Sequence, residues 1–103
     1  MGFGIARGNG GDTVVTGHGC DAVTTTGACS SNVRVNGKGI VRFGDAVLPH
    51  LFPVGRACVS HAPTLDGNYS SSVKVNGKFA AFEGSTYLGH VITSSSSSVK
   101  IGK

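Results

Sequence analysis

Charged residues and large apolar residues are both scarce in this 103-residue sequence. Charged residues make up 14% of it, below the ~25% of a typical soluble domain. The sequence has no tryptophan, one methionine, five phenylalanines and two tyrosines, whereas seventeen residues are glycine. The length predicts a single domain, residues 1–103. Such a domain has little apolar surface to bury, so we expect a further source of stability. The low charge content indicates a surface that is largely polar and uncharged or is covered by a partner.

Long apolar runs are also missing. No stretch approaches the ~18 apolar residues that span a membrane, and residues 1–7 lack the apolar core of a signal peptide. We therefore expect export by another route or assembly inside a cell. The three cysteines are an odd number, so without a signal peptide a disulfide framework is not expected. Nine basic residues outnumber five acidic ones, but they are scattered, which argues against a nucleic-acid partner.

The strongest positive feature is an internal repeat. Residues 32–50 and 72–90 align without a gap at an offset of 40 residues. The first unit reads NVRVNGKGIVRFGDAVLPH and the second reads SVKVNGKFAAFEGSTYLGH. Such self-similarity is typical of a supersecondary unit that buries its apolar face only against further copies of itself.

A third unit is split between the two ends of the chain, residues 97–103 and 3–18. Residues 97–103 repeat the strand and the start of the turn, and residues 5–18 repeat the part of the unit 32–50 that lies after its turn. We therefore expect the C-terminal strand to pair with the N-terminal strand. The three units together predict an approximately threefold arrangement of β-hairpins.

The local patterns predict an all-β fold. Val-Arg-Val at 33–35 and Val-Lys-Val at 73–75 alternate apolar and basic side chains, as a strand with one buried face does. Asn36-Gly37 and Asn76-Gly77 come directly after these strands, and Asn-Gly suits the two positive φ angles of a type I′ hairpin turn. No window shows a helical period with caps.

All four histidines fall in predicted loops. His18, His50 and His90 each come six or seven residues after a Gly-Asp or Gly-Ser corner, once in each unit. A threefold arrangement would bring these three together, and His61 could supply a fourth ligand. Four such side chains suit a tetrahedral structural zinc site, which would add the stability that the core lacks.

The cysteines offer alternative ligands. Cys20 lies two residues after His18, and Cys58 precedes His61 with C-x-x-H spacing, so either thiolate could bind the metal. Cys29 is interpreted as a buried packing residue.

The sequence resembles the PAAR-repeat proteins over essentially its whole length. The likeness is carried by Thr16-Gly17-His18-Gly19, by Ser31 to Lys38, by Arg42-Phe43-Gly44-Asp45 and by Ser72 to Lys78. The Pro-Ala-Ala-Arg segment that names the family is half kept, as Ala80-Ala81 and as Arg42.

This resemblance implies a small cone of three hairpin repeats with a metal near its apex. The family's ligands are three histidines and a cysteine; His18 matches the first, and His50 and His61 match the middle pair. The cysteine is absent here, and His90 would replace it. The resemblance therefore implies zinc as the cofactor, with iron as the alternative for an all-histidine shell.

The resemblance also implies a partner and a role. The family caps the trimeric β-helical spike of contractile injection machines, with one tip per trimer, and helps it pierce an outer membrane. A short chain favours a phage tail baseplate, so the expected location is the virion after assembly in the host cytoplasm. A type VI secretion tip, made in the bacterial cytoplasm and then delivered, is the alternative.

Two other classes of function are less favoured. A zinc-dependent hydrolase would need a general base, for which Asp21 is the nearest acid, but no catalytic motif accompanies it, so the chain is predicted not to be an enzyme. A carbohydrate-binding module could use Tyr69 and Tyr87 for stacking, although two tyrosines more often pack in a core.

Overall fold

The computed structural model describes residues 3–101, and within them every regular element is a β-strand. The all-β prediction is therefore confirmed for this part of the chain. The strands are β1 (Phe3–Gly4), β2 (Thr13–Val15), β3 (Val23–Thr25), β4 (Arg34–Val35), β5 (Lys38–Gly39), β6 (His50–Val54), β7 (Ala57–His61), β8 (Lys74–Val75), β9 (Lys78–Phe79), β10 (Thr86–Tyr87), β11 (His90–Ile92) and β12 (Lys100–Ile101).

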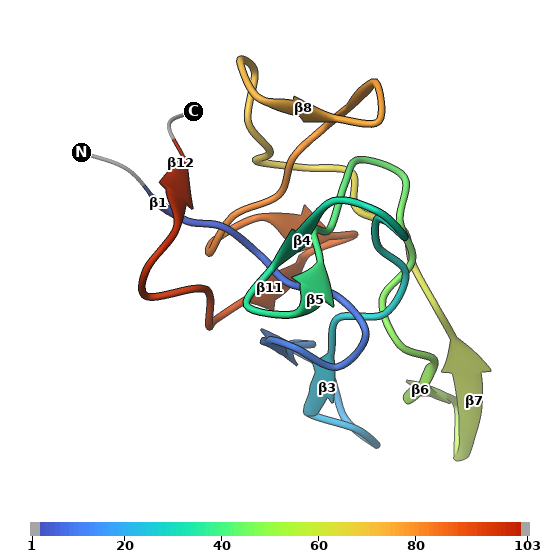
Figure 1. The fold of residues 1–103 in the computed structure, drawn as a ribbon. Coiled ribbons are helices and arrows are strands. Elements are labelled where there is room, and N and C mark those ends of the chain that lie inside the picture. Colours follow the sequence, from blue (N-terminus) through green and yellow to red (C-terminus); the bar gives the residue numbers. More distant parts are fainter. Residues whose placement is uncertain (1–2, 102–103) are drawn as a thin grey trace.

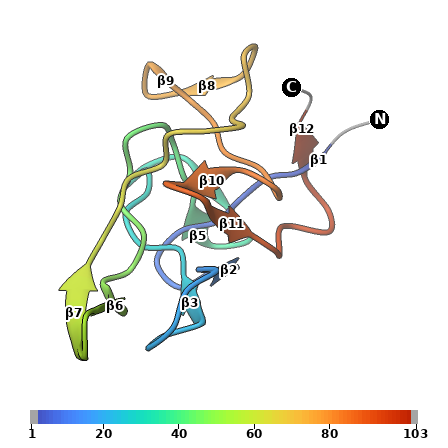
Figure 2. The same ribbon diagram turned by 180° about the vertical axis from the view of Figure 1, so that it is seen from behind.

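The strands form one four-stranded antiparallel sheet and several two-stranded ribbons. The sheet has the order β10-β11-β2-β3, and the ribbons are β1–β12, β4–β5, β6–β7 and β8–β9. The molecule is elongated, 42 × 26 × 22 Å. Figures 1 and 2 show the β6–β7 hairpin projecting at one end, with β8 and the paired ends of the chain at the other.

The two Asn-Gly turns have the predicted geometry. Asn36 and Gly37 have φ angles of 54° and 80°, and Asn76 and Gly77 have 55° and 79°. Positive φ at both central positions is the mark of a type I′ turn, whose twist matches that of the flanking strands. Each turn joins a pair of two-residue strands, β4 to β5 and β8 to β9.

The expected pairing of the chain ends is also present. Phe3 lies opposite Ile101 and Gly4 opposite Lys100 in the β1–β12 ribbon. Because its two strands come from opposite ends of the chain, the β1–β12 ribbon has no connecting turn within the described residues.

A closed ring of backbone hydrogen bonds joins the three repeat units. The amide of Ala6 donates to the carbonyl of Ala81, that of Ala81 to Val41, and that of Val41 back to Ala6, at 2.9–3.1 Å. All three residues are fully buried. They occupy equivalent places in their units, so the ring relates the units in an approximately threefold way.

Small side chains make up most of the two core clusters, and the three residues of the ring belong to the first of them. One cluster is built around Val14, Leu65 and Tyr87, and the other around Ile5 and Ile40. Most of their other members are valine or alanine. The thin core that the composition predicted is therefore present.

Two largely buried ion pairs brace the corners that lead toward the histidines. Arg7 pairs with Asp12 at 2.7 Å and Arg42 pairs with Asp45 at 2.9 Å. Each carboxylate also accepts a hydrogen bond from the backbone N–H of the arginine with which it pairs. The unit 72–90 has neither charge, because the buried Phe82 takes the place of the arginine and Ser85 takes that of the aspartate.

Candidate metal centre

The four histidines converge on one point. His18 lies in the loop between β2 and β3, His50 begins β6, His61 ends β7 and His90 begins β11. One ring nitrogen from each lies within 4.8 Å of the others. His50 and His61 are opposite each other in the β6–β7 register, and this pairing places His61 in the cluster although it has no counterpart in the repeat.

The ring nitrogens have nearly the spacing of a tetrahedral zinc site. Nε2 of His61 lies 2.8 Å from that of His50, 3.2 Å from that of His18 and 3.3 Å from that of His90. Nε2 of His90 lies 2.9 Å from that of His50 and 3.1 Å from that of His18. Zinc–nitrogen bonds of 2.0–2.1 Å in a tetrahedron place neighbouring nitrogens about 3.4 Å apart. Small outward movements of the rings would complete such a site.

Hydrogen bonds at the other ring nitrogens select the metal-binding tautomer. Nδ1–H of His18 donates to the carbonyl of Gly19 at 2.8 Å, and Nδ1–H of His50 donates to the carbonyl of Leu48 at 3.0 Å. A proton on Nδ1 leaves the lone pair on Nε2, the nitrogen that points into the cluster. Nδ1 of His90 is buried and outside hydrogen-bond geometry.

Electrostatics favour neutral imidazoles at this point. Burial, followed by repulsion from His50 and His18, lowers the pKa of His61. The pKa of His90 is lowered by the same two causes in the same order, and the carbonyl of Leu88 opposes this only in part. The Nε2 lone pairs of His18 and His50 are both directed into the cluster, and a cation there would accept them. The donor set therefore fits a bound metal ion, and a shell of four imidazoles suits zinc and also iron.

Phe52 forms a wall of the site. Its ring lies 4.1 Å from the ring of His61 and 6.2 Å from the ring of His18, measured between centroids. It belongs to the same face of the β6–β7 hairpin as His50 and His61, because the three positions alternate along the strands. An apolar wall of this kind limits access of water to the metal position.

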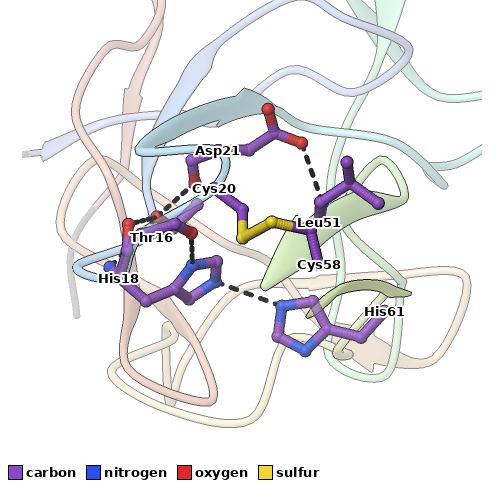
Figure 3. The surroundings of a disulfide bond; sticks show 8 residues. Thr16, His18, Cys20, Asp21, Leu51, Cys58 and His61 are labelled. Carbon is purple, nitrogen blue, oxygen red and sulfur yellow. Dashed lines mark hydrogen bonds between the residues drawn. A yellow bond between two sulfur atoms is a disulfide. The ribbon is translucent and has the colours of Figure 1, made fainter. Parts of the chain in front are cut away.

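The expectation of no disulfide is wrong. Cys20 and Cys58 are disulfide-bonded, with their Cα atoms 6.0 Å apart, and the bond lies beside His18 and His61 (Figure 3). Because both sulfurs are used in this bond, neither cysteine is the alternative ligand that the sequence allowed. Cys29 is a free, partly buried thiol packed against the core, as predicted.

Three residues considered for other functions have structural contacts instead. The carboxylate of Asp21 accepts the backbone N–H of Leu51 at 2.8 Å, so it ties the His18 loop to β6. Tyr87 is fully buried, and Tyr69 packs between the rings of Phe43 and Phe79.

The disulfide was the part of the site that sequence reasoning missed. The signal was the position of each cysteine beside a candidate ligand, two residues after His18 and three before His61. In the sequence this spacing indicates competition for the metal, because the two cysteines are 38 positions apart and only the fold brings them together.

No family model matches the chain, and no curated protein matches it. Within residues 3–101 the structure has no helix that is long and apolar enough to cross a membrane.

Proposed function

We propose that the chain is a PAAR-like tip that caps the trimeric β-helical spike of a contractile injection machine. The ring formed by Ala6, Val41 and Ala81 carries this proposal. Three equivalent units in one monomer can each meet an equivalent patch on three identical subunits. The expected stoichiometry is therefore one chain per trimer.

The hairpin segments offer the surface for such a partner. Residues 30–39, 70–79 and 96–101 contain five basic residues and no acidic one. All five basic side chains are exposed, and Val33 and Val99 beside them are 37% exposed. An interface with an apolar centre and a basic rim would suit a spike whose end carries acidic residues.

The opposite end supports contact with a membrane. The β6–β7 hairpin exposes Leu51, Val54 and Val59, and its turn carries the exposed Arg56. The hairpin contains no acidic residue. A projecting apolar hairpin with one cation can enter the headgroup region of an outer membrane when the machine contracts, and the metal would keep the hairpin attached to the body.

A structural metal, not a catalytic one, agrees with this role. Four histidines close a tetrahedral shell, whereas catalytic zinc keeps a position open for water or substrate. Asp21, the acid nearest in sequence to His18, already accepts a backbone hydrogen bond. We therefore infer a mechanical function without substrate turnover.

The setting that we favour is a phage tail baseplate, with the tip in the virion after assembly in the host cytoplasm. A type VI secretion spike is the alternative, and the same monomer geometry would serve there. No nucleic-acid contact is proposed, because the basic residues surround a small base and do not form a stripe.

The test is co-expression of this chain with the trimeric spike protein of the same machine. Native mass spectrometry of the purified complex should give one chain per spike trimer. Reversing the basic rim with Arg34→Glu, Lys74→Glu and Lys100→Glu should weaken the complex, whereas Arg56→Glu at the far hairpin should not. No complex, or three chains per trimer, would refute the proposal.

A further inference from the structure

The four candidate ligands are held in two different ways. His50 and His90 are buried, at 5% and 4% exposure, and each begins a strand. His18 and His61 are more exposed, and they lie in the β2–β3 loop and at the end of β7. The disulfide-bonded cysteines flank these two half-buried ligands, with Cys20 two residues from His18 and Cys58 three residues from His61.

Few other bonds attach the His18 loop to the rest of the site. Thr16 Oγ1 donates to the carbonyl of Asp21 at 2.7 Å and accepts the amide of His18 at 3.3 Å, and both bonds are internal to the loop. Two hydrogen bonds link the loop to β6. The amide of Leu51 donates to the Asp21 carboxylate at 2.8 Å, and the amide of Asp21 donates to the carbonyl of Leu51 at 3.3 Å. Cys20 itself has a φ of 69°, which a residue with a side chain adopts only at a cost.

We propose that the Cys20–Cys58 disulfide positions His18 and His61 for the metal, so that metal binding and the oxidation state of this bond are coupled. The oxidised chain holds both ligands at the point of convergence before the ion arrives (Figure 3). In the reduced chain the loop is free to move away from β7, and part of the binding free energy is lost in ordering it again. The inference depends on metal binding by the four histidines and not on the spike-tip role.

The chemistry of the switch is an ordinary exchange with a dithiol. A thiolate of the dithiol attacks one sulfur of the bond, and the other cysteine leaves as a thiolate. The second thiol of the reagent then closes on the mixed disulfide. Two electrons and two protons have moved to Cys20 and Cys58, and the dithiol has become a cyclic disulfide. Both cysteines are exposed, so a reductant can reach the bond.

Coupling of this kind is reciprocal. If reduction weakens metal binding by a given factor, metal binding makes the disulfide harder to reduce by the same factor. Outer partners that orient metal ligands typically contribute 10–100-fold in affinity, and we expect about tenfold here. For a two-electron couple, a tenfold change corresponds to about 30 mV.

The first experiment measures zinc affinity of the full chain by competition with a chromophoric chelator. Wild type is measured oxidised and after reduction with a phosphine, which becomes a phosphine oxide and introduces no competing thiol. The double variant Cys20→Ser/Cys58→Ser is measured in both conditions. Cys29→Ala is the matched control, because it removes the free thiol and keeps the disulfide.

We expect reduced wild type and the double variant to bind zinc about tenfold more weakly than oxidised wild type, and Cys29→Ala to behave like wild type. Equal affinity of the oxidised and reduced wild type would overturn the proposal. So would tighter binding after reduction with thiolate-to-metal absorption in the cobalt-loaded chain, because the cysteines would then be ligands. Failure of the oxidised chain to bind zinc would refute the metal site itself.

The second experiment needs no variant, so a folding defect cannot obscure it. The disulfide of wild type is titrated against a dithiol redox buffer, with and without saturating zinc, and the free thiols are counted by mass after alkylation. The cysteine pair should require a potential about 30 mV more reducing when zinc is bound. An unchanged midpoint in a chain that binds zinc would contradict the coupling.

Discussion

Removing the metal should destabilise the chain strongly. The Nε2 atoms of the four histidines converge, with 2.8–3.3 Å between the two atoms in five of the pairs, so an ion at their centre would join the β2–β3 loop, β6, β7 and β11. Structural zinc contributes about 10 kcal/mol or more of apparent binding free energy in small domains. At free zinc roughly 100 times the dissociation constant, the folded state gains about 2.7 kcal/mol.

That gain predicts a large shift in melting temperature. For a domain of roughly 100 residues, 1 kcal/mol moves the midpoint by about 4–8 °C, so zinc should raise it by about 10–20 °C. The assay is thermal unfolding of oxidised protein in zinc buffers of stepped free concentration. Each tenfold increase above the dissociation constant should add about 1.4 kcal/mol, so the midpoint should keep rising with the logarithm of free zinc.

Two variants separate binding at the cluster from adventitious binding. His50→Ala removes a buried ligand and should abolish most of the zinc response. Ser60→Ala alters an exposed neighbour of His61 and should keep the full response. A midpoint that does not depend on zinc, or an equal response in His50→Ala and wild type, would refute the reasoning from the histidine geometry.

Three further predictions concern the metal-free or whole domain. Folding lowers the pKa of His61 and of His90, so below pH ~6.5 the unfolded chain binds more protons than the folded chain. The metal-free chain should therefore lose stability as the pH falls below this value. A flat profile of denaturation midpoints between about pH 5 and 8 would contradict this. Asp45→Ala removes the carboxylate partner of the largely buried Arg42 and should cost about 3–5 kcal/mol in urea unfolding. Arg42→Phe/Asp45→Ser, which introduces the pair found in unit 72–90, should cost less, and a double variant worse than the single one would count against this account. Gly77→Ala forces a side chain into a φ of 79° and should cost about 1–2 kcal/mol, and an unchanged midpoint would show that the turn relaxes.

The sequence was most informative where the chemistry is local. The two Asn-Gly dipeptides come after alternating strands, and both adopt the type I′ turn, because the preference for positive φ belongs to the residues themselves. The pairing of the chain ends, with Phe3 opposite Ile101, was also predictable. The repeat assigns the strand at each end of the chain to the same hairpin unit, so the two strands are expected to pair.

The histidine site could be predicted in part. His18, His50 and His90 recur with the repeat, so a threefold arrangement of the units implied that they meet. His61 has no equivalent in the other units. Its position in the cluster depends on its cross-strand pairing with His50 in the β6–β7 hairpin. Residues 50–61 contain no Asn-Gly dipeptide that would predict this hairpin. Its turn contains Gly55 instead, which has a φ of 60°.

By itself, then, the amino-acid order determined the all-β class, the hairpin turns, the repeat and three of the four converging histidines, since each depends on residues close in the chain or on a period that can be counted. Only the tertiary structure decided that Cys20 bonds to Cys58, that Asp21 bonds to the backbone of Leu51 and that Tyr87 is fully buried. These contacts join segments that are distant in sequence, and their partners become neighbours only after the three units have packed around one core.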